Sequence, residues 1–164
     1  SLRMPVICAV NGVAAGAGAS VAMACDIAIA APTASFVQAF SKIGLIPDAG
    51  GSWLLVERLG LPRAMALAMT GDKLSADKAK EWGLIWEVAE DCVAAALAMA
   101  EKLAVMPTQA LVATRHLLRD AGTRSLDAHL NVERDTQSAL GKTHDYMEGV
   151  NAFLQKRAPQ FKGE

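Results

Sequence analysis

The sequence predicts an α/β region followed by a region of helices, on three observations. A continuous apolar run at residues 5–10 has the pattern of a strand buried on both faces. A turn of small residues at 11–19 follows this run, as between a strand and a helix. Beyond residue 90 the apolar positions recur with the period of a helix. We therefore expect two regions, 1–90 with strands and helices, and 91–164 with helices alone.

The first region alternates between short strands and short helices. We predict strands at 27–31, 35–40 and 84–88 and helices at 20–25, 51–60, 61–71 and 75–83. Pro62 suits the first turn of a helix, and Ser75 is a good N-cap. The strand at 5–10 needs neighbours on both sides, and residues 1–164 supply few. We therefore expect strands of this sheet to lie outside this sequence, which would make it the C-terminal part of a longer protein.

The second region is predicted to hold amphipathic helices that end at proline or glycine. Their ranges are 91–106, 108–122, 125–140 and 143–157. On the last of them, Tyr146, Val150, Phe153 and Leu154 share one face. These helices are too few for a rich core of their own, so we expect them to pack on the first region or on another subunit.

Composition narrows the classes of partner. The net charge is −1, and no basic tract is present, so nucleic acid and membrane surfaces are not indicated as partners. The cysteines Cys8, Cys25 and Cys92 are not spaced as a metal site and are interpreted as buried, reduced thiols of a cytoplasmic protein. The three histidines are interpreted as solvated surface residues, so no metal is expected.

The segment GAGASV at 16–21 is the first candidate for chemistry. It lacks the third glycine of a dinucleotide fingerprint and the lysine of a phosphate-binding loop. Two interpretations remain open from the spacing. The first N–H groups of the helix could stabilise an oxygen that gains negative charge. Alternatively, the small residues only allow the helix and strand to pack closely.

The segment IGLIPDAGG at 43–51 is the second candidate, because a carboxylate stands among apolar residues. Asp48 could cap the helix that begins near Gly51, which is ordinary for an aspartate at that place. The apolar neighbours, which include Ile43 and Trp53, favour another role. A carboxylate partly withdrawn from water there would have a raised pKa, as a general base near neutral pH requires.

Three blocks of sequence together resemble one known family. VNGVAAGAG followed by ACDIAIA, then FSKIGLIPDAGGSWLL, and at the end EGVNAFLQKRAPQFKG, are similar to the enoyl-CoA hydratase/isomerase (crotonase) superfamily. The resemblance covers essentially the whole chain. It implies a crotonase-like α/β spiral of ββα units, incomplete here, followed by an α-helical oligomerisation region that builds trimers or hexamers.

The resemblance also implies a substrate and a site. The family binds acyl-CoA thioesters, so coenzyme A would be part of the substrate and no separate cofactor is expected. One of two backbone donors to the thioester oxygen would be the N–H of Ala17, and the other would come from an earlier segment outside this sequence. Without that donor, the fragment itself would turn over poorly. The substrate-binding residues implied are Gly16, Gly18, Phe40, Ile43 and Trp53.

Carboxylates separate the reactions of the family. Hydratases carry two glutamates, at the positions of Ser20 and Phe40 here, so hydration is not indicated. Asp48 stands where family isomerases use an acid, which implies isomerisation with Asp48 as the base. The longer blocks of sequence are similar to those of the family's isomerases in phenylacetate catabolism. Fatty-acyl isomerases, hydratase-like enzymes, dehalogenase-like relatives with a nucleophilic aspartate, and an inactive assembly fragment remain as alternatives.

Overall fold

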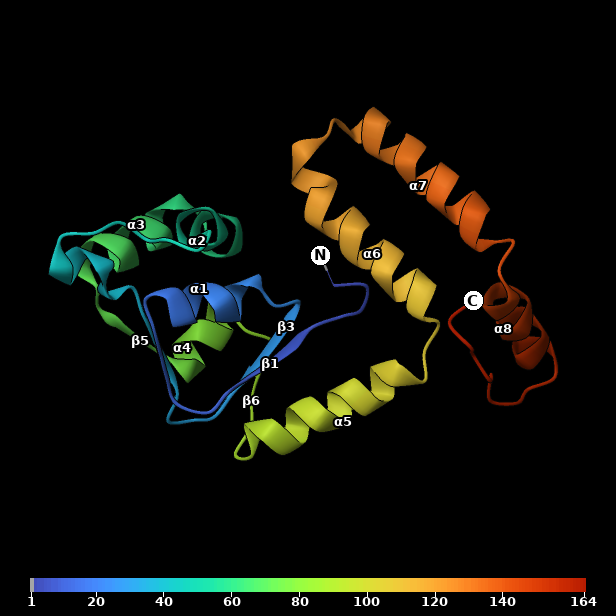
Figure 1. Cartoon of the computed structure of the whole chain (residues 1–164), viewed down its shortest axis with the longest axis horizontal. Coiled ribbons are helices and arrows are strands. Elements are labelled where there is room, and N and C mark those ends of the chain that lie inside the picture. Colours follow the sequence, from blue (N-terminus) through green and yellow to red (C-terminus); the bar gives the residue numbers. More distant parts are fainter. Residues whose placement is uncertain (1) are drawn as a thin grey trace. The chain divides into compact units, whose positions relative to one another are not determined.

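The computed structural model describes residues 2–164, which form two compact units (Figure 1). The first unit is Val6–Met99 and holds every strand described. The second unit joins residues 2–5 to Ala100–Glu164 and consists of helices and their connections.

Two small sheets form the frame of the first unit. One sheet has the order β1–β3–β6 and is parallel throughout, with bounds Ile7–Val10, Ile27–Ala30 and Glu87–Val88. The other has the order β2–β4–β5, with bounds Val13–Ala15, Ser35–Val37 and Lys73–Ser75. In it, β4 runs parallel to β2 and antiparallel to β5.

The chain alternates between the two sheets as it advances. It forms β1, β2 and then helix α1 (Ala17–Ala24), and next β3, β4 and, after the short 3₁₀ helix η1 (Ala39–Ile43), helix α2 (Gly51–Leu59). Helices α3 (Leu61–Thr70) and α4 (Ala76–Glu81) complete the unit. This repetition is the predicted spiral of ββα units, which the structure confirms.

The core of the first unit is made of small residues from α1 and larger ones from the strands and from α2. Ala19 is fully buried, and Ile29 and Leu55 are the largest apolar side chains that are almost completely buried. Small side chains on α1 allow close packing, because the helix axis can approach its neighbours more nearly. As a result, the two residues that flank the predicted site, Ser20 and Phe40, also lie inside the unit.

The second unit has far less interior. Its helices are α6 (Thr108–Asp120), the 3₁₀ turn η2 (Ala121–Thr123), α7 (Leu126–Leu140) and α8 (His144–Leu154), and α5 (Cys92–Ala104) leads into it from the first unit. The hydroxyls of Ser125 and Thr143 cap α7 and α8 by accepting backbone N–H bonds. Of residues 100–164, only Asp145 and Ala152 are buried. The expectation that these helices make no rich core of their own is confirmed.

Several predicted boundaries were wrong. Helix α1 begins at Ala17, three residues before the predicted range, because Gly16 takes a positive φ of 54° and turns the chain directly into the helix. The predicted strand at 35–40 ends at Val37 and gives way to η1. The predicted strand at 84–88 is reduced to Glu87–Val88. The short strands β2 and β5 were not predicted at all.

Candidate active site

The glycine turn before α1 leaves two backbone donors free. Gly16 donates its N–H to the carbonyl of Val37 at 2.9 Å, which joins the turn to the end of β4. Its own carbonyl accepts the N–H groups of Ala19 and Ser20. The N–H groups of Ala17 and Gly18 have no acceptor within residues 2–164, and both residues are exposed. Two free N–H groups at a helix start can hold an anionic oxygen.

Phe40 lies beneath this turn. Its ring end is 3.6 Å from where a Cβ on Gly16 would stand, and the side chain is buried. A residue larger than glycine at position 16 would need an unfavourable φ, although its Cβ would meet the ring only at ordinary van der Waals distance. Phe40 supports the turn from below, and its predicted contact with substrate stays a prediction.

Asp48 does not cap α2. The N-cap position is Gly50, and no side chain accepts a bond from the helix start. Instead, the backbone carbonyl of Asp48 accepts the N–H of Gly51 at 2.7 Å, and the two residues between them, Ala49 and Gly50, have positive φ angles of 48° and 78°. This tight turn presents Asp48 to the exterior, where its carboxylate has no hydrogen bond or ion pair within residues 2–164. The capping interpretation was wrong.

The apolar residues near Asp48 do not bury it. Ile43 and Ile46 are 71% and 81% exposed, and Trp53 is 55% exposed. The expectation that they withdraw Asp48 from water was wrong for the residues described, because Asp48 is itself exposed. The result is an unpaired carboxylate within a stretch of exposed apolar side chains. Such a stretch suits a largely apolar ligand, which would exclude water from the carboxylate when it binds.

A contact between helices links the two halves of the site. Ser20 lies one turn along α1 from Ala17, is fully buried, and packs against Gly51. A Cβ added at Gly51 would clash with the Ser20 hydroxyl oxygen and lie 3.3 Å from its Cβ. The second glycine of the pair is therefore needed for space, and the first, Gly50, for its positive φ. Through this contact the start of α1 and the Asp48 turn are neighbours.

Arg58 on α2 was missed by sequence reasoning. Its Nη2 atom donates to the carbonyls of Met23, at 2.8 Å, and Cys25, at 3.0 Å, at the end of α1. No motif could have revealed this contact, because both acceptors are backbone atoms. The only signal was a single basic residue on an otherwise amphipathic helix.

The cysteines and histidines contribute no metal site. Within residues 2–164, no group of three or more potential ligands could hold a metal ion. All three cysteines are free thiols; Cys92 is buried, and Cys8 and Cys25 are half-buried. Burial raises the pKa of Cys8 to about 11, with smaller contributions from the neighbouring Cys25 and Cys92. Such a thiol is not a ready nucleophile.

The interpretation of all three histidines as solvated surface residues was wrong for His129. His116 is exposed, whereas the side chain of His129 is only 14% exposed and contacts Glu133 at 3.4 Å. The Nδ1 atom of His129 is buried without a partner among the residues described. His144 lies at the start of α8, beside Asp145.

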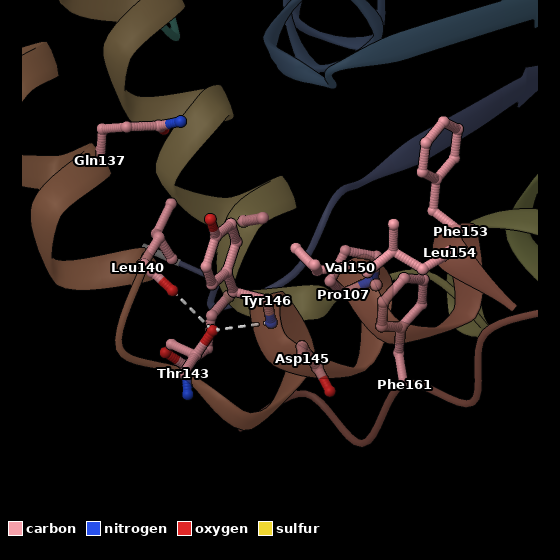
Figure 2. Close-up of a pocket in the computed structure, with 14 residues that line it drawn as sticks. Pro107, Gln137, Leu140, Thr143, Asp145, Tyr146, Val150, Phe153, Leu154 and Phe161 are labelled. Carbon is pink, nitrogen blue, oxygen red and sulfur yellow. Dashed lines mark hydrogen bonds between the residues drawn. The ribbon is translucent and has the colours of Figure 1, made fainter.

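A cavity lies in the helical unit, away from the residues of the predicted site (Figure 2). It has a volume of about 550 Å³ and is lined by residues of α6, α7, α8 and the C-terminal segment, among them Leu140, Tyr146, Val150 and Phe161. Asp145, its one carboxylate, already accepts the N–H groups of Lys162 and Gly163. With its one carboxylate already bonded, this cavity offers mainly apolar surface.

The fold and the glycine turn together define the family. A model of the enoyl-CoA hydratase/isomerase family matches residues 1–164, and the chain belongs to that family. The chain is 54% identical to the 1,2-epoxyphenylacetyl-CoA isomerase of Escherichia coli K12, over 99% of this chain and 63% of that protein. It is 35% identical to the trans-2-decenoyl-[acyl-carrier-protein] isomerase of Streptococcus mutans, again over 99% of this chain and 63% of that protein.

Solved structures agree with this assignment. The crystal structure of an enoyl-CoA hydratase from Polaromonas sp. JS666 superimposes with a TM-score of 0.94 at 41% identity, over 98% of this chain and 63% of that one. The chain thus spans about two thirds or slightly less of each relative's length. None of the helices within residues 2–164 has the length and apolar character needed to cross a membrane.

Proposed function

We propose that the protein containing this chain is an acyl-CoA isomerase, in which Asp48 moves a proton and the N–H of Ala17 stabilises the thioester oxygen. The observation that carries the proposal is the pairing of free donors with a free carboxylate. Ala17 and Gly18 hold unpaired N–H groups, and the Asp48 turn is joined to their helix by the contact of Ser20 with Gly51. Gly16, Gly18, Ile43 and Trp53 would contact the acyl-CoA, and Phe40 would complete the floor of the site.

The proton would be taken and returned by one group. The Asp48 carboxylate removes a proton from the carbon next to the thioester carbonyl, and the electron pair moves onto the carbonyl oxygen. The Ala17 N–H donates a hydrogen bond to that oxygen, which lowers the energy of the anionic intermediate. The protonated Asp48 then returns the proton to another carbon, and the double bond has moved. No water is consumed, which agrees with the absence of carboxylates at Ser20 and Phe40.

The substrate that we propose first is 2-(1,2-epoxy-1,2-dihydrophenyl)acetyl-CoA, converted to the oxepin-CoA of phenylacetate catabolism. The support is the 54% identity to a protein named for this isomerisation. A second candidate is the movement of a double bond in an unsaturated fatty-acyl thioester. The 35% identity to the trans-2-decenoyl-[acyl-carrier-protein] isomerase favours it.

Asp48→Asn, made in the complete natural protein, tests the role of Asp48. Asparagine has nearly the same shape and cannot accept the proton, so turnover should fall by about 10²- to 10⁴-fold while binding of a CoA ester hardly changes. Asp72→Asn is the matched control, since Asp72 is an exposed aspartate whose carboxylate has no partner within residues 2–164. Near-normal turnover in Asp48→Asn would contradict the assignment, and accumulation of a covalent acyl-enzyme would indicate a nucleophile instead of a base.

The reaction in ¹⁸O-labelled water separates isomerase from hydratase. An isomerase shifts the double bond, or opens the epoxide ring, without taking oxygen from the solvent. A hydratase incorporates one labelled oxygen per turnover, which mass spectrometry of the product detects. Labelled product would contradict the proposal, and a complete protein that binds no CoA ester at all would leave only an assembly role.

A further inference from the structure

Helix α2 holds α1 at two places, and only one of them belongs to the glycine motif. Near the start of α1, Ser20 packs on Gly51. At the end of α1, Arg58 donates from Nη2 to the carbonyl oxygens of Met23 and Cys25, at 2.8 and 3.0 Å. A side chain two turns along α2 thus caps the far end of α1.

This cap is needed by α1 itself. The last carbonyl groups of any helix find no N–H donor within the helix. A buried carbonyl group without a donor destabilises the fold. Met23 is buried, and α1 has no basic residue in its own last turn. The positive guanidinium supplies both the missing donor and a charge that suits the negative end of the helix dipole. Arg58 therefore fixes the end of α1 with two hydrogen bonds and a charge, and a neutral side chain could supply only the hydrogen bonds.

We infer that Arg58 is a positioning residue, which keeps the Ala17 N–H aligned with Asp48 by fixing both ends of α1 to α2. This inference rests on the proposed function. Helix α2 begins directly after the Asp48 turn, so the element that places the base also holds the element that places the donor. Relative motion of donor and base requires α1 to move on α2, and the two contacts oppose that motion.

A lever-arm estimate gives the size of the effect. Without Arg58, the end of α1 loses its bonds to α2, and the contact of Ser20 with Gly51 is the point about which the helix tilts. Ala17 lies three residues from that pivot, or about 4.5 Å at 1.5 Å per residue, so a tilt of about 10° moves its N–H by about 0.8 Å. A misplacement of about 1 Å at a reacting centre costs on the order of 100-fold in rate. We expect Arg58→Met to lower kcat by about 10- to 100-fold with a small change in KM.

The test compares three variants of the complete natural protein. Arg58→Met removes the cap, Arg58→Lys keeps the charge and can reach one carbonyl, and Arg63→Met is the matched control. Arg63 lies on α3, with its guanidinium 4.9 Å from the centre of the Trp82 ring and no bond to α1, so its loss removes the same charge and a comparable contact. For each protein, kcat, KM and melting temperature are measured.

A spectroscopic measurement separates positioning from stability. When a conjugated thioester such as cinnamoyl-CoA binds, hydrogen bonds to its carbonyl oxygen polarise it and shift its absorbance to longer wavelength. We expect a full shift for the unmodified protein, Arg63→Met and Asp48→Asn, a reduced shift for Arg58→Met, and an intermediate shift for Arg58→Lys. A rate loss that follows the reduced shift supports the inference.

Two failures are distinguishable. If Arg58→Met keeps the full shift and normal kcat while its melting temperature falls, Arg58 only stabilises the fold and the positioning inference is overturned. If Arg58→Met does not fold, Arg58→Lys decides: an unchanged shift and kcat overturn the inference. If the unmodified protein shows no shift, or Asp48→Asn turns over normally, the proposed function itself fails, whatever Arg58 does.

Discussion

Ala49 shows local backbone strain beside the predicted site, because it has a positive φ of 48° without being glycine. The left-handed conformation costs an alanine roughly 1–2 kcal/mol. The turn of residues 48–51 needs it, since Asp48 and Gly51 close the turn through their backbones. Strain of this kind often lies beside functional groups, where the surrounding structure maintains it. Here it holds the segment that presents Asp48.

Ala49→Gly should therefore stabilise the protein. Glycine removes the strain but loses more conformational entropy on folding, so the net gain is expected to be at most about 1 kcal/mol. Ala66→Gly, in an exposed position inside α3, is the control and should destabilise by about 0.5–1 kcal/mol. Thermal unfolding of both variants gives the comparison. The same sign for both would contradict the conformation described for residue 49.

Gly51 is required for space, in contrast to its neighbour. Gly51→Ala places a Cβ against the Ser20 hydroxyl and should destabilise by about 1–3 kcal/mol, typical of overpacking. Ser20→Ala combined with Gly51→Ala should recover part of that loss, because the clashing oxygen is gone. Gly12→Ala, with nothing within 4 Å of the added Cβ, is the control. Additive effects of the two substitutions in denaturant unfolding would show that the contact is absent.

The roles at residue scale differ in how far the sequence revealed them. The roles of Asp48 and Ala17 could be predicted because their motif is local and resembles that of a known family, and they stay predictions. The burial of Asp48 was predicted wrongly, since apolar residues near it in the sequence do not show whether their loop is buried or exposed. Arg58 left no signal beyond being the one basic residue of its helix, because it bonds to backbone atoms 33 and 35 residues away. Contacts of this kind become visible only when the two helices are placed in space.

At the scale of elements, the end of α8 and the segment after it are joined by carboxylates. Glu148 accepts two bonds from the Arg157 guanidinium, at 2.6 and 2.8 Å, and one from the N–H of Gln160. Asp145, which is buried, accepts the N–H groups of Lys162 and Gly163. These bonds hold Phe161 against Gly149, on the wall of the cavity in Figure 2. The C-terminal segment is therefore anchored by charge rather than by a large buried surface.

This anchoring should weaken in acid. The bonds from Arg157 and from Gln160 hold the pKa of Glu148 at about 2, below its ordinary value of 4.5. Despite its burial, the pKa of Asp145 is also lowered, by its bonds to Lys162 and Gly163 and by His144. A lowered folded-state pKa contributes stability above the ordinary value that is lost as pH falls through the folded value. We expect protection of the Gln160, Lys162 and Gly163 amides against hydrogen exchange to fall between about pH 4.5 and 2.

Glu148→Gln should lower the protection of the Gln160 amide already at neutral pH and flatten its acid dependence. Glu101→Gln is the control, because Glu101 is an exposed glutamate on α5 without a partner in the part of the chain described. Amide exchange followed by NMR, with intrinsic rates corrected for pH, makes the measurement. Unchanged protection in Glu148→Gln would contradict the role given to this ion pair.

Elements with local signals were predicted well. The predicted N-cap Ser75 begins α4, and the predicted ranges 125–140 and 143–157 begin at the observed caps Ser125 and Thr143 of α7 and α8. The predicted ranges 51–60 and 61–71 end at the glycines that close α2 and α3. The strands β2 and β5 have three residues each and were missed. Strands so short exist only through their pairing with β4, and no periodicity can show over three residues.

At the scale of the whole molecule, exposed apolar side chains are the main feature left without a partner in this chain. On α8, Phe153 and Leu154 are 82% and 71% exposed, and Tyr146 is 52% exposed. Exposed apolar groups of this size on one helix commonly mark an interface. Oligomerisation as a trimer or hexamer therefore stays the prediction for this protein.

Phe153→Asp should shift the protein towards smaller species in light scattering at micromolar concentration. A buried interface position would be destabilised by an unpaired charge, so subunits should separate. Leu61→Asp on α3, which replaces a side chain that is 58% exposed, controls for the added charge alone and should leave the mass unchanged. A monodisperse monomer for the unmodified protein would contradict the prediction outright.

The parallel pairing of β2 with β4 also bears on how reactions diverge in evolution. Ala17 comes shortly after β2, and Phe40 and Asp48 come after β4. These positions therefore follow two neighbouring strands, which lie about 4.8 Å apart. Backbone hydrogen bonds set that spacing, and no side chain is needed to maintain it. Mutation can therefore exchange the exposed residue at position 48 while the turn that presents the Ala17 N–H keeps its place. Position 20 is less free, because its packing on Gly51 limits it to small residues unless α2 moves away. New activities in this lineage are thus expected to arise first by substitution on the β4 side.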